Sequence, residues 1–153
     1  MNNINDIVLE HLQPILGELN LFLVEVKINE RTETVRVFID KMEGITIEDC
    51  VAVSRALEKS LNEAINFSEK YALEVSSPGA DQPFKVHEQY VQYLNRPVEA
   101  IAYNGMKYTG TLKEVSDSGI VITTEKKEKK NILHEDINLN FKDIKTTKPF
   151  LKY

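Results

Sequence analysis

The sequence has no tryptophan, a single cysteine, and only 6 glycines and 5 prolines among its 153 residues. One cysteine cannot form an internal disulfide, and Cys50 lies in an apolar helical pattern, which predicts a buried, unreactive thiol rather than a nucleophile. No apolar run approaches the ~20 residues that a bilayer requires, and the polar start M-N-N-I-N-D-I does not resemble a signal peptide. These absences predict a soluble, cytoplasmic protein without a membrane partner.

Signals of catalysis are also lacking. His11, His87 and His134 fall in separate predicted elements with no ligand-like spacing. No G-x-S-x-G pattern surrounds the only adjacent serine pair, and the glycines stand singly at turns rather than in a phosphate-binding loop. The sequence therefore predicts a binding protein rather than an enzyme, with no cofactor, no metal and no small-molecule substrate.

The charge of the chain is unevenly distributed. Hydrophobic residues make up 42% and charged residues 28%, which is typical of a globular protein, and the net charge is −5. Residues 1–85 carry a net charge of −7, whereas residues 86–153 carry +2. The two halves are expected to meet different partners, and binding to nucleic acid would need local basic patches or a protein partner.

The first half predicts a helix, two strands, a second helix and a third strand. Apolar spacing predicts the first helix over Asn3 to Leu19, with Pro14 breaking or kinking it near Leu12. An alternating pattern from Phe22 to Ile28 predicts a strand. Its inward residues are expected to be Phe22, Val24, Val26 and Ile28.

After a polar turn, the strand pattern repeats with Val35, Val37 and Ile39 inward, which predicts a hairpin. Thr46 and Asp49 have the spacing of a capping box, which predicts a helix running to about Ala64. Its predicted core face is Ile47, Cys50, Leu57, Leu61 and Ala64, and a third strand contains Tyr71, Leu73 and Val75.

The second half predicts a short helix followed by β-structure only. Residues 86–94 are predicted to form the helix, which ends at Asn95-Arg96-Pro97. Asn104-Gly105 predicts a hairpin turn, and further short strands follow on both sides of a charged tip, Glu125 to Lys130. Four or five short strands in this length favour a small barrel of the SH3 or Sm type.

The predicted fold class is therefore α+β. Residues 1–85 form an N-terminal two-layer domain with two helices on a three-stranded sheet, and residues 86–153 form a small all-β barrel after the linking helix 86–94.

The segment Leu73 to Lys85, L-E-V-S-S-P-G-A-D-Q-P-F-K, joins the two predicted domains. Pro78-Gly79 fits the centre of a type II turn, in which the glycine takes a positive φ, and Pro83 prevents a strand from continuing. The segment is either a rigid elbow or a partner-binding loop. In the second case its contact residues are Ser76, Ser77, Gly79, Asp81, Gln82 and Lys85.

Two further surfaces allow a functional and a purely structural interpretation. On the sheet face that the helices leave open, Arg36 and Glu74 lie beside Phe38, which is either a platform for a partner or a lone half-exposed ring. The lysines of the charged tip either contact phosphates or simply solvate a hairpin. These tip lysines are Lys126, Lys127, Lys129 and Lys130.

Three stretches together resemble the family of bacterial ribosome maturation factors known as RimP. They are R-V-F-I-D-K-M-E-G-I-T-I-E-D-C, V-S-R-A-L and, above all, L-E-V-S-S-P-G-A-D-Q-P-F-K. Weaker matches follow in N-R-P-V, G-T-L and D-I-K. The resemblance extends over nearly the whole chain.

The resemblance implies a KH-like N-terminal domain, a C-terminal Sm-like barrel, and a non-enzymatic assembly factor that binds the immature small (30S) ribosomal subunit. The implied partners are 16S rRNA and a ribosomal protein near the decoding centre. The alternative is a stand-alone RNA-binding module that acts on free RNA. Carried over by position, the family-like polar residues are Asp40, Asp49, Arg55, Glu74, Ser76, Ser77, Asp81 and Lys145.

The chain departs from the family pattern inside the motif itself. The family commonly reads S-P-G-L-D-R-P-L, whereas this chain has Ala80, Gln82 and Phe84. A guanidinium binds carboxylate or phosphate in a bidentate manner, while a glutamine amide offers only neutral hydrogen bonds. Either position 82 is not a phosphate contact in this chain, or binding relies on the nearby Lys85.

Overall fold

The computed structural model describes residues 3–79 and 81–150, apart from the side chains of 126–128. The chain divides into two compact units, Met1–Pro78 and Gly79–Tyr153. The sequence-based boundary, between residues 85 and 86, stays a prediction. Each unit is described by itself.

The first unit begins with helix α1, Ile4–Leu19. The side chain of Asn3 accepts a hydrogen bond from the amide of Asp6 and so caps the helix N-terminus. The predicted break near Leu12 is wrong, because α1 runs on through Pro14. Its buried residues, Val8, Leu12 and Leu16, pack into the core and hold the helix across the missing backbone donor.

Strands β1, Phe22–Asn29, and β2, Thr34–Asp40, form the predicted antiparallel hairpin. The register shifts between Leu23 and Glu25, so a β-bulge interrupts the alternation. Leu23 packs against the core, and Phe22 pairs with Asp40 on the opposite face, so the expectation that Phe22 points inward is wrong. A period-two pattern cannot reveal an inserted residue.

Helix α2, Ile47–Ile65, starts at the predicted capping box. Asp49 donates its amide to the Thr46 hydroxyl at 3.1 Å, and the Thr46 amide donates to the Asp49 carboxylate at 3.0 Å. The buried face is Val53, Leu57 and Leu61. The expected core positions at the two ends of the helix are wrong, since Ile47 is 81% exposed and Ala64 is also exposed.

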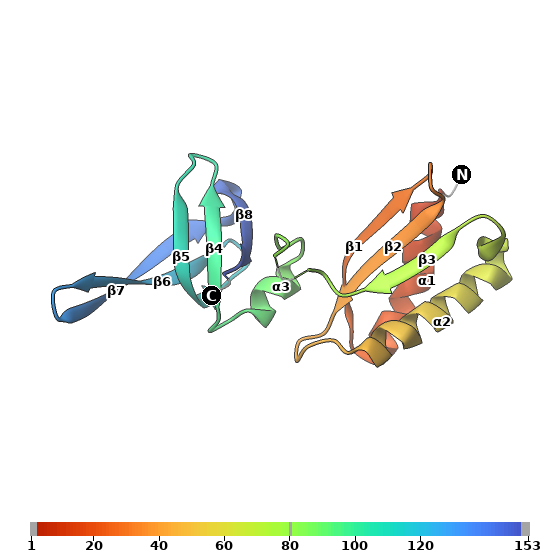
Figure 1. Cartoon of the computed structure of the whole chain (residues 1–153), viewed down its shortest axis with the longest axis horizontal. Helices are drawn as coiled ribbons and strands as arrows, with labels where there is room; N and C mark the ends of the chain where they lie inside the picture. Colours follow the sequence, from red (N-terminus) through yellow and green to blue (C-terminus); the bar gives the residue numbers. More distant parts are fainter. Residues whose placement is uncertain (1–2, 80, 151–153) are drawn as a thin grey trace. The chain divides into compact units, whose positions relative to one another are not determined.

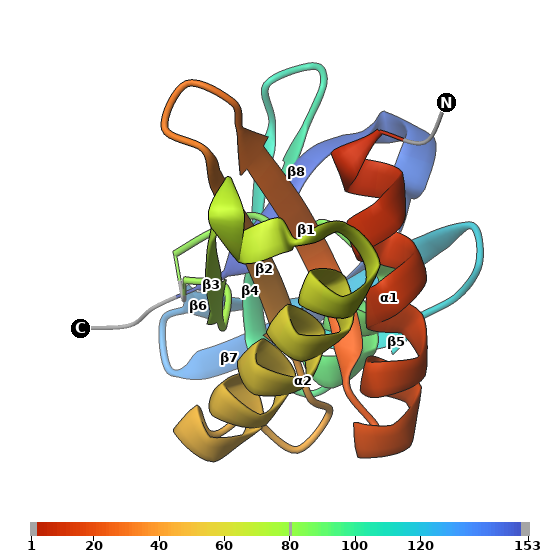
Figure 2. The ribbon, with the colours of Figure 1, turned by 90° about the vertical axis from the view of Figure 1, so that its right-hand side faces the viewer.

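The short 3₁₀ turn η1, Phe67–Glu69, leads into strand β3, Ala72–Ser76, which pairs with β2 in parallel. The sheet order is β1-β2-β3, and Figure 2 shows α1 and α2 on one face of it. The predicted inward residues of β2, namely Val35, Val37 and Ile39, are fully buried beneath the helices. The two-layer arrangement predicted from the sequence is confirmed.

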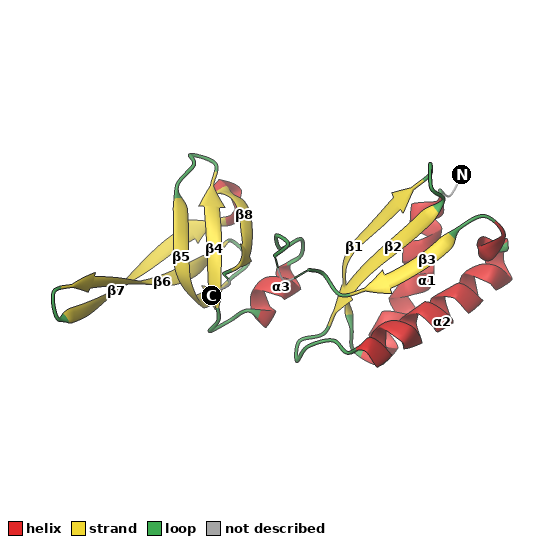
Figure 3. Cartoon of the chain, in the orientation of Figure 1, coloured by secondary structure: helices red, strands yellow, loops and turns green. Residues whose placement is uncertain are grey.

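Among its described residues, the second unit has one α-helix, α3, His87–Gln92, followed mainly by strands (Figures 1 and 3). Its strands are β4, Pro97–Ala102, β5, Lys107–Val115, β6, Gly119–Glu128, β7, Asn131–Asn140, and β8, Ile144–Pro149, with the 3₁₀ turn η2, Phe141–Asp143, before β8. They form one antiparallel sheet of order β7-β6-β5-β4-β8. This order is compatible with the predicted Sm-like barrel.

The core of the second unit joins apolar strand residues to a cluster of aromatic rings. Val98, Leu112 and Ile122 are fully buried, and the rings of Phe84 and Tyr90 pack against this core. The linking helix is shorter than residues 86–94, but Asn95 has a φ of 68°, the left-handed geometry expected at that position.

The predicted turn between β4 and β5 forms at Gly105, which has a φ of 89°. The charged segment Glu125 to Lys130 lies at the end of the β6–β7 hairpin, as predicted, but the strands reach further than expected. Residues 125–128 belong to β6, and only Lys129 and Lys130 form the turn (Figure 3). Paired backbone hydrogen bonds along the ribbon outweigh the low strand propensity of a lysine-rich segment.

Gly110 allows a close approach between β5 and β6. A Cβ atom added there would lie 2.3 Å from the carbonyl oxygen of Thr123 and 2.9 Å from a methyl group of Ile122. We expect Gly110→Ala to destabilise the second unit by about 1–3 kcal/mol. Hydrogen exchange of the β5 and β6 amides in the full chain measures this.

The matched control is Gly17→Ala in α1, where a Cβ atom would meet nothing within 4 Å. This change should stabilise the first unit by roughly 0.5–1 kcal/mol, because alanine favours the helix. If the Gly110→Ala chain were as stable as the unaltered chain, the prediction would be wrong, because β5 and β6 could then move apart without loss of stability.

Candidate functional site

A groove in the first unit brings the start of α2 beside the end of β3. It has a volume of about 380 Å³. Ser76 and Ser77, two of the predicted contact residues, form part of its wall. The other residues that line it are Ile45, Thr46, Ile47, Cys50, Val51, Ser54 and Val75.

Apolar side chains at and beside the groove are exposed. Ile47 is 81% exposed and Val51 is 40% exposed, and Met42 in the preceding loop is 42% exposed. On a helix of 3.6 residues per turn, Ile47 and Val51 lie roughly 80° and 120° around the axis from Leu57, which points into the core. Neighbouring exposed apolar side chains of this kind mark interaction surfaces.

The polar groups beside the groove are fixed by the capping box. The pKa of the Asp49 carboxyl is lowered, chiefly because the Thr46 amide donates to it, and the Thr46 side chain and the charge of Lys41 add to the effect. The pKa of the Cys50 thiol is raised by burial and by the charges of Asp49 and Asp40. Cys50 is only half-buried rather than buried, but it is held in the unreactive thiol form.

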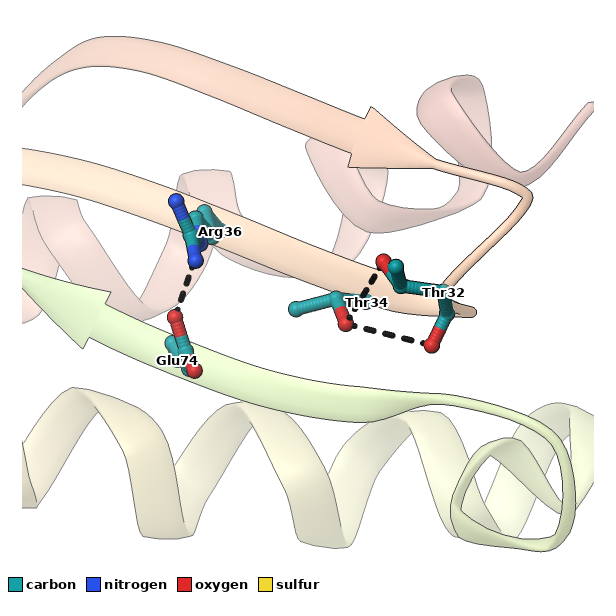
Figure 4. Close-up of polar contacts among 4 residues, drawn as sticks. All are labelled: Thr32, Thr34, Arg36 and Glu74. Carbon is teal, nitrogen blue, oxygen red and sulfur yellow. Dashed lines mark hydrogen bonds and ion pairs between the residues drawn. The ribbon is translucent and has the colours of Figure 1, made fainter.

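A second surface is the open face of the sheet, where Arg36 on β2 and Glu74 on β3 are register partners. The Arg36 guanidinium donates to the Glu74 carboxylate at 2.9 Å, as Figure 4 shows. The ammonium of Lys27 lies 5.7 Å from the centre of the Phe38 ring. Both members of the Arg36–Glu74 pair are more than half exposed, so the pair adds little stability and its groups remain accessible.

Asp40 lies at the end of the same strand, where its carboxylate accepts from the Lys41 amide at 2.8 Å. Arg55, by contrast, is exposed on α2, which covers the other face of the sheet. The candidate contacts of the first domain, Arg36, Asp40, Arg55 and Glu74, therefore do not form one cluster.

The joining loop differs from its prediction. Gly79 does not have the positive φ that a type II turn requires at that position. Instead, the Gln82 amide donates to the Gly79 carbonyl at 3.0 Å, so the chain turns later than expected. The Gln82 side chain donates to the Asp81 carboxylate at 3.4 Å, and both residues are exposed.

The boundary between the two units falls inside this loop, between Pro78 and Gly79. Ser76 and Ser77 belong to the first unit, whereas Gly79, Asp81 and Gln82 belong to the second. The last predicted loop residue, Lys85, is also in the second unit. Its amide donates to the side chain of Gln89, which caps the start of α3.

Four of the five candidate lysines of the second unit lie at the end of the β6–β7 hairpin, and the fifth lies on β8. Lys126 and Lys127 are consecutive residues of β6, paired with Leu133 and Ile132, and their side chains lie outside the described part of the chain. Lys129 and Lys130 are exposed at the turn. Lys145 is exposed on β8, at the other end of the strand order from β7.

The apolar character of the groove comes above all from Ile45, Ile47 and Val51, none of which was predicted to be a contact residue. One available signal was that Ile47 directly follows the helix cap, where side chains often extend past the core. The other was that Ile47 and Val51 fall outside the four-residue series of Val53, Leu57 and Leu61 and so lie on a different side of the helix.

Two observations concern other kinds of site. Within the described residues, no three His, Cys, Asp or Glu side chains are grouped so that they could hold a metal ion. Over the same residues, no helix has the length and apolar character needed to cross a membrane.

The first unit is a three-stranded sheet covered by α1 and α2, and the second unit is a small antiparallel β-sheet domain. Residues 11–81 match the family model of the RimP N-terminal domain. Residues 11–81 therefore form a RimP N-terminal domain, which belongs to a family of ribosome maturation factors. The matched segment contains the whole groove, the open sheet face and the motif up to Asp81.

The capping box makes the stability of the first unit depend on pH. Because the pKa of Asp49 is lowered in the folded chain, its contribution is complete above the unfolded value of about 4. It is lost as the pH falls through the folded-state pKa. Asp49→Asn should therefore lower the urea midpoint at pH 7 and have progressively less effect below pH 4.

The control is Glu48→Gln, which removes a carboxylate from the same helical turn but leaves the capping box intact. Urea unfolding of both variants and the unaltered chain between pH 7 and pH 3 makes the comparison. An effect of Asp49→Asn that is the same at every pH would contradict the assignment.

Proposed function

We propose that this protein is a non-enzymatic assembly factor that binds the immature small (30S) ribosomal subunit in the cytoplasm and promotes its maturation. The observation that carries the proposal is the position of the V-S-S-P-G segment. Its two serines form a wall of the accessible apolar groove, within the segment that matches the family.

The distribution of charge supports a particle that offers both protein and RNA. The first unit carries a net charge of −7 and the second +2. Phosphate groups repel the first unit and attract local cations of the second, whereas basic proteins complement the first. A ribosomal subunit presents both kinds of surface.

We assign the contacts as follows. The groove wall and the loop residues Asp81 and Gln82 contact the subunit, and the exposed lysines of the second unit contact the phosphate backbone of 16S rRNA. A ribosomal protein near the decoding centre is the proposed protein partner. Arg36, Asp40 and Glu74 contribute through the open sheet face, and Arg55 through the exposed side of α2.

Sedimentation tests this function. In extracts from cells that make the protein, it should migrate with free small subunits and be absent from mature, joined ribosomes. Migration at the top of the gradient, together with retained binding to naked RNA, would favour the alternative of a module that acts on free RNA. Migration at the top with no RNA binding would contradict both.

Asp81→Ala tests the loop. The residue is exposed and its described partner is the neighbouring Gln82, so the change should leave both units folded. We expect about tenfold weaker binding to purified immature subunits, equivalent to ~1.4 kcal/mol.

The matched control is Asp117→Ala, the same change in an exposed turn between β5 and β6. It should leave affinity within about twofold of the unaltered chain. Equal affinities of both variants would remove the loop from the interface, and unfolding of the Asp81→Ala chain would make the loop a structural element.

A further inference from the structure

The groove beside α2 has a lining that restricts its ligand. The residues that form it are aliphatic, hydroxyl-bearing or a thiol, and neither an aromatic ring nor a basic side chain is among them. Proteins hold single-stranded RNA by stacking bases on aromatic or arginine planes and by neutralising phosphates. The described lining of this groove offers no flat side chain on which a base could stack and no cation that could neutralise a phosphate.

The sequence lacks the loop that a KH-type fold uses for RNA. A G-x-x-G loop clamps the nucleotide backbone in KH domains. The six glycines stand at positions 17, 44, 79, 105, 110 and 119, so no two are three residues apart. A KH-like sheet without this loop has no such clamp to hold the phosphates.

Charge around the groove favours a cationic ligand. Glu48 and Asp49 follow Ile47 directly, and Glu43 precedes the groove in the loop, where it is paired with Lys41 at 3.6 Å. The whole first unit carries −7. A segment rich in lysine and arginine would be attracted to this surface, and a polyphosphate would be repelled.

The backbone beside the groove is suited to a peptide. β3 is an edge strand in the order β1-β2-β3, and its residues Val75 and Ser76 also line the groove. An extended peptide can pair its own N–H and C=O groups with an edge strand. A volume of about 380 Å³ holds one or two of its apolar side chains.

We propose that this groove binds an extended, basic protein segment, which inserts an apolar side chain between Ile47 and Val51 of α2 and Val75 of β3. The inference rests on the proposed function, because it takes that segment to be a protein of the small subunit. The second unit then contributes the RNA contacts. The groove would recognise this segment by an apolar side chain and by its positive charge, whereas a phosphate-binding surface recognises negative charge.

A photoreactive side chain tests the class of partner. p-Benzoylphenylalanine in place of Ile47, in the full-length chain bound to purified immature small subunits, should crosslink on irradiation to a protein segment of net positive charge. Crosslinks to rRNA would overturn the proposal. So would crosslinks only to a second copy of this chain, or none despite co-sedimentation.

Paired substitutions test the apolar anchor. Ile47→Ser combined with Val51→Ser should weaken binding to immature subunits at least tenfold. Because both side chains are exposed, at 81% and 40%, the thermal midpoint should remain close to that of the unaltered chain. The control, Ala52→Ser, changes an exposed residue of the same helix outside the groove and should bind within twofold.

The outcomes separate the two proposals. If the unaltered chain does not bind small subunits, the proposed function is wrong, and the inference falls with it. If the unaltered chain binds and the double variant binds equally well, the function stands and only the groove assignment is wrong.

Discussion

Two reciprocal hydrogen bonds between Thr46 and Asp49 fix where α2 begins, and the rest of the first unit depends on that start. With the first turn held in this register, Val53, Leu57 and Leu61 point into the sheet. The same register leaves Ile47 and Val51 outside the core, next to the end of β3. One local interaction thus positions both the core and the apolar groove.

The parallel pairing of β2 with β3 completes this geometry. It places Glu74 opposite Arg36 on the open face and brings Ser76 to the level of Phe38. The β3 strand then ends directly at the motif, so Ser76 and Ser77 lie against the helix start. The edge strand β3 therefore contributes to two surfaces. It supplies Glu74 to the charged pair on the open sheet face, and its last residues line the apolar groove beside α2.

The arrangement of elements could be predicted from the sequence because each local pattern agreed with the fold. Alternation identified β2, and the T-x-x-D spacing identified the start of α2. The predictions failed where tertiary packing overrode a local rule. The bulge after Leu23 put Phe22 on the opposite face from Val26 and Ile28, Pro14 was accommodated within α1, and the strands of the β6–β7 hairpin extended into the lysine-rich segment.

The same contrast applies to the site. Ser76 and Ser77 could be singled out from the turn chemistry of their segment, but their aliphatic neighbours in the groove could not. Those neighbours come from residues about thirty positions earlier, and their proximity follows from how α2 packs on the sheet.

By itself, the sequence determined the element types, the capping box and the acidic and basic halves. These follow from short-range spacing and composition. Only the tertiary structure decided that Ile47 and Val51 face outward, that Gly79 lacks a positive φ, and that Arg36 pairs with Glu74. Such facts depend on register and packing between distant segments, where one inserted residue or one shifted turn reverses the side chains that are exposed.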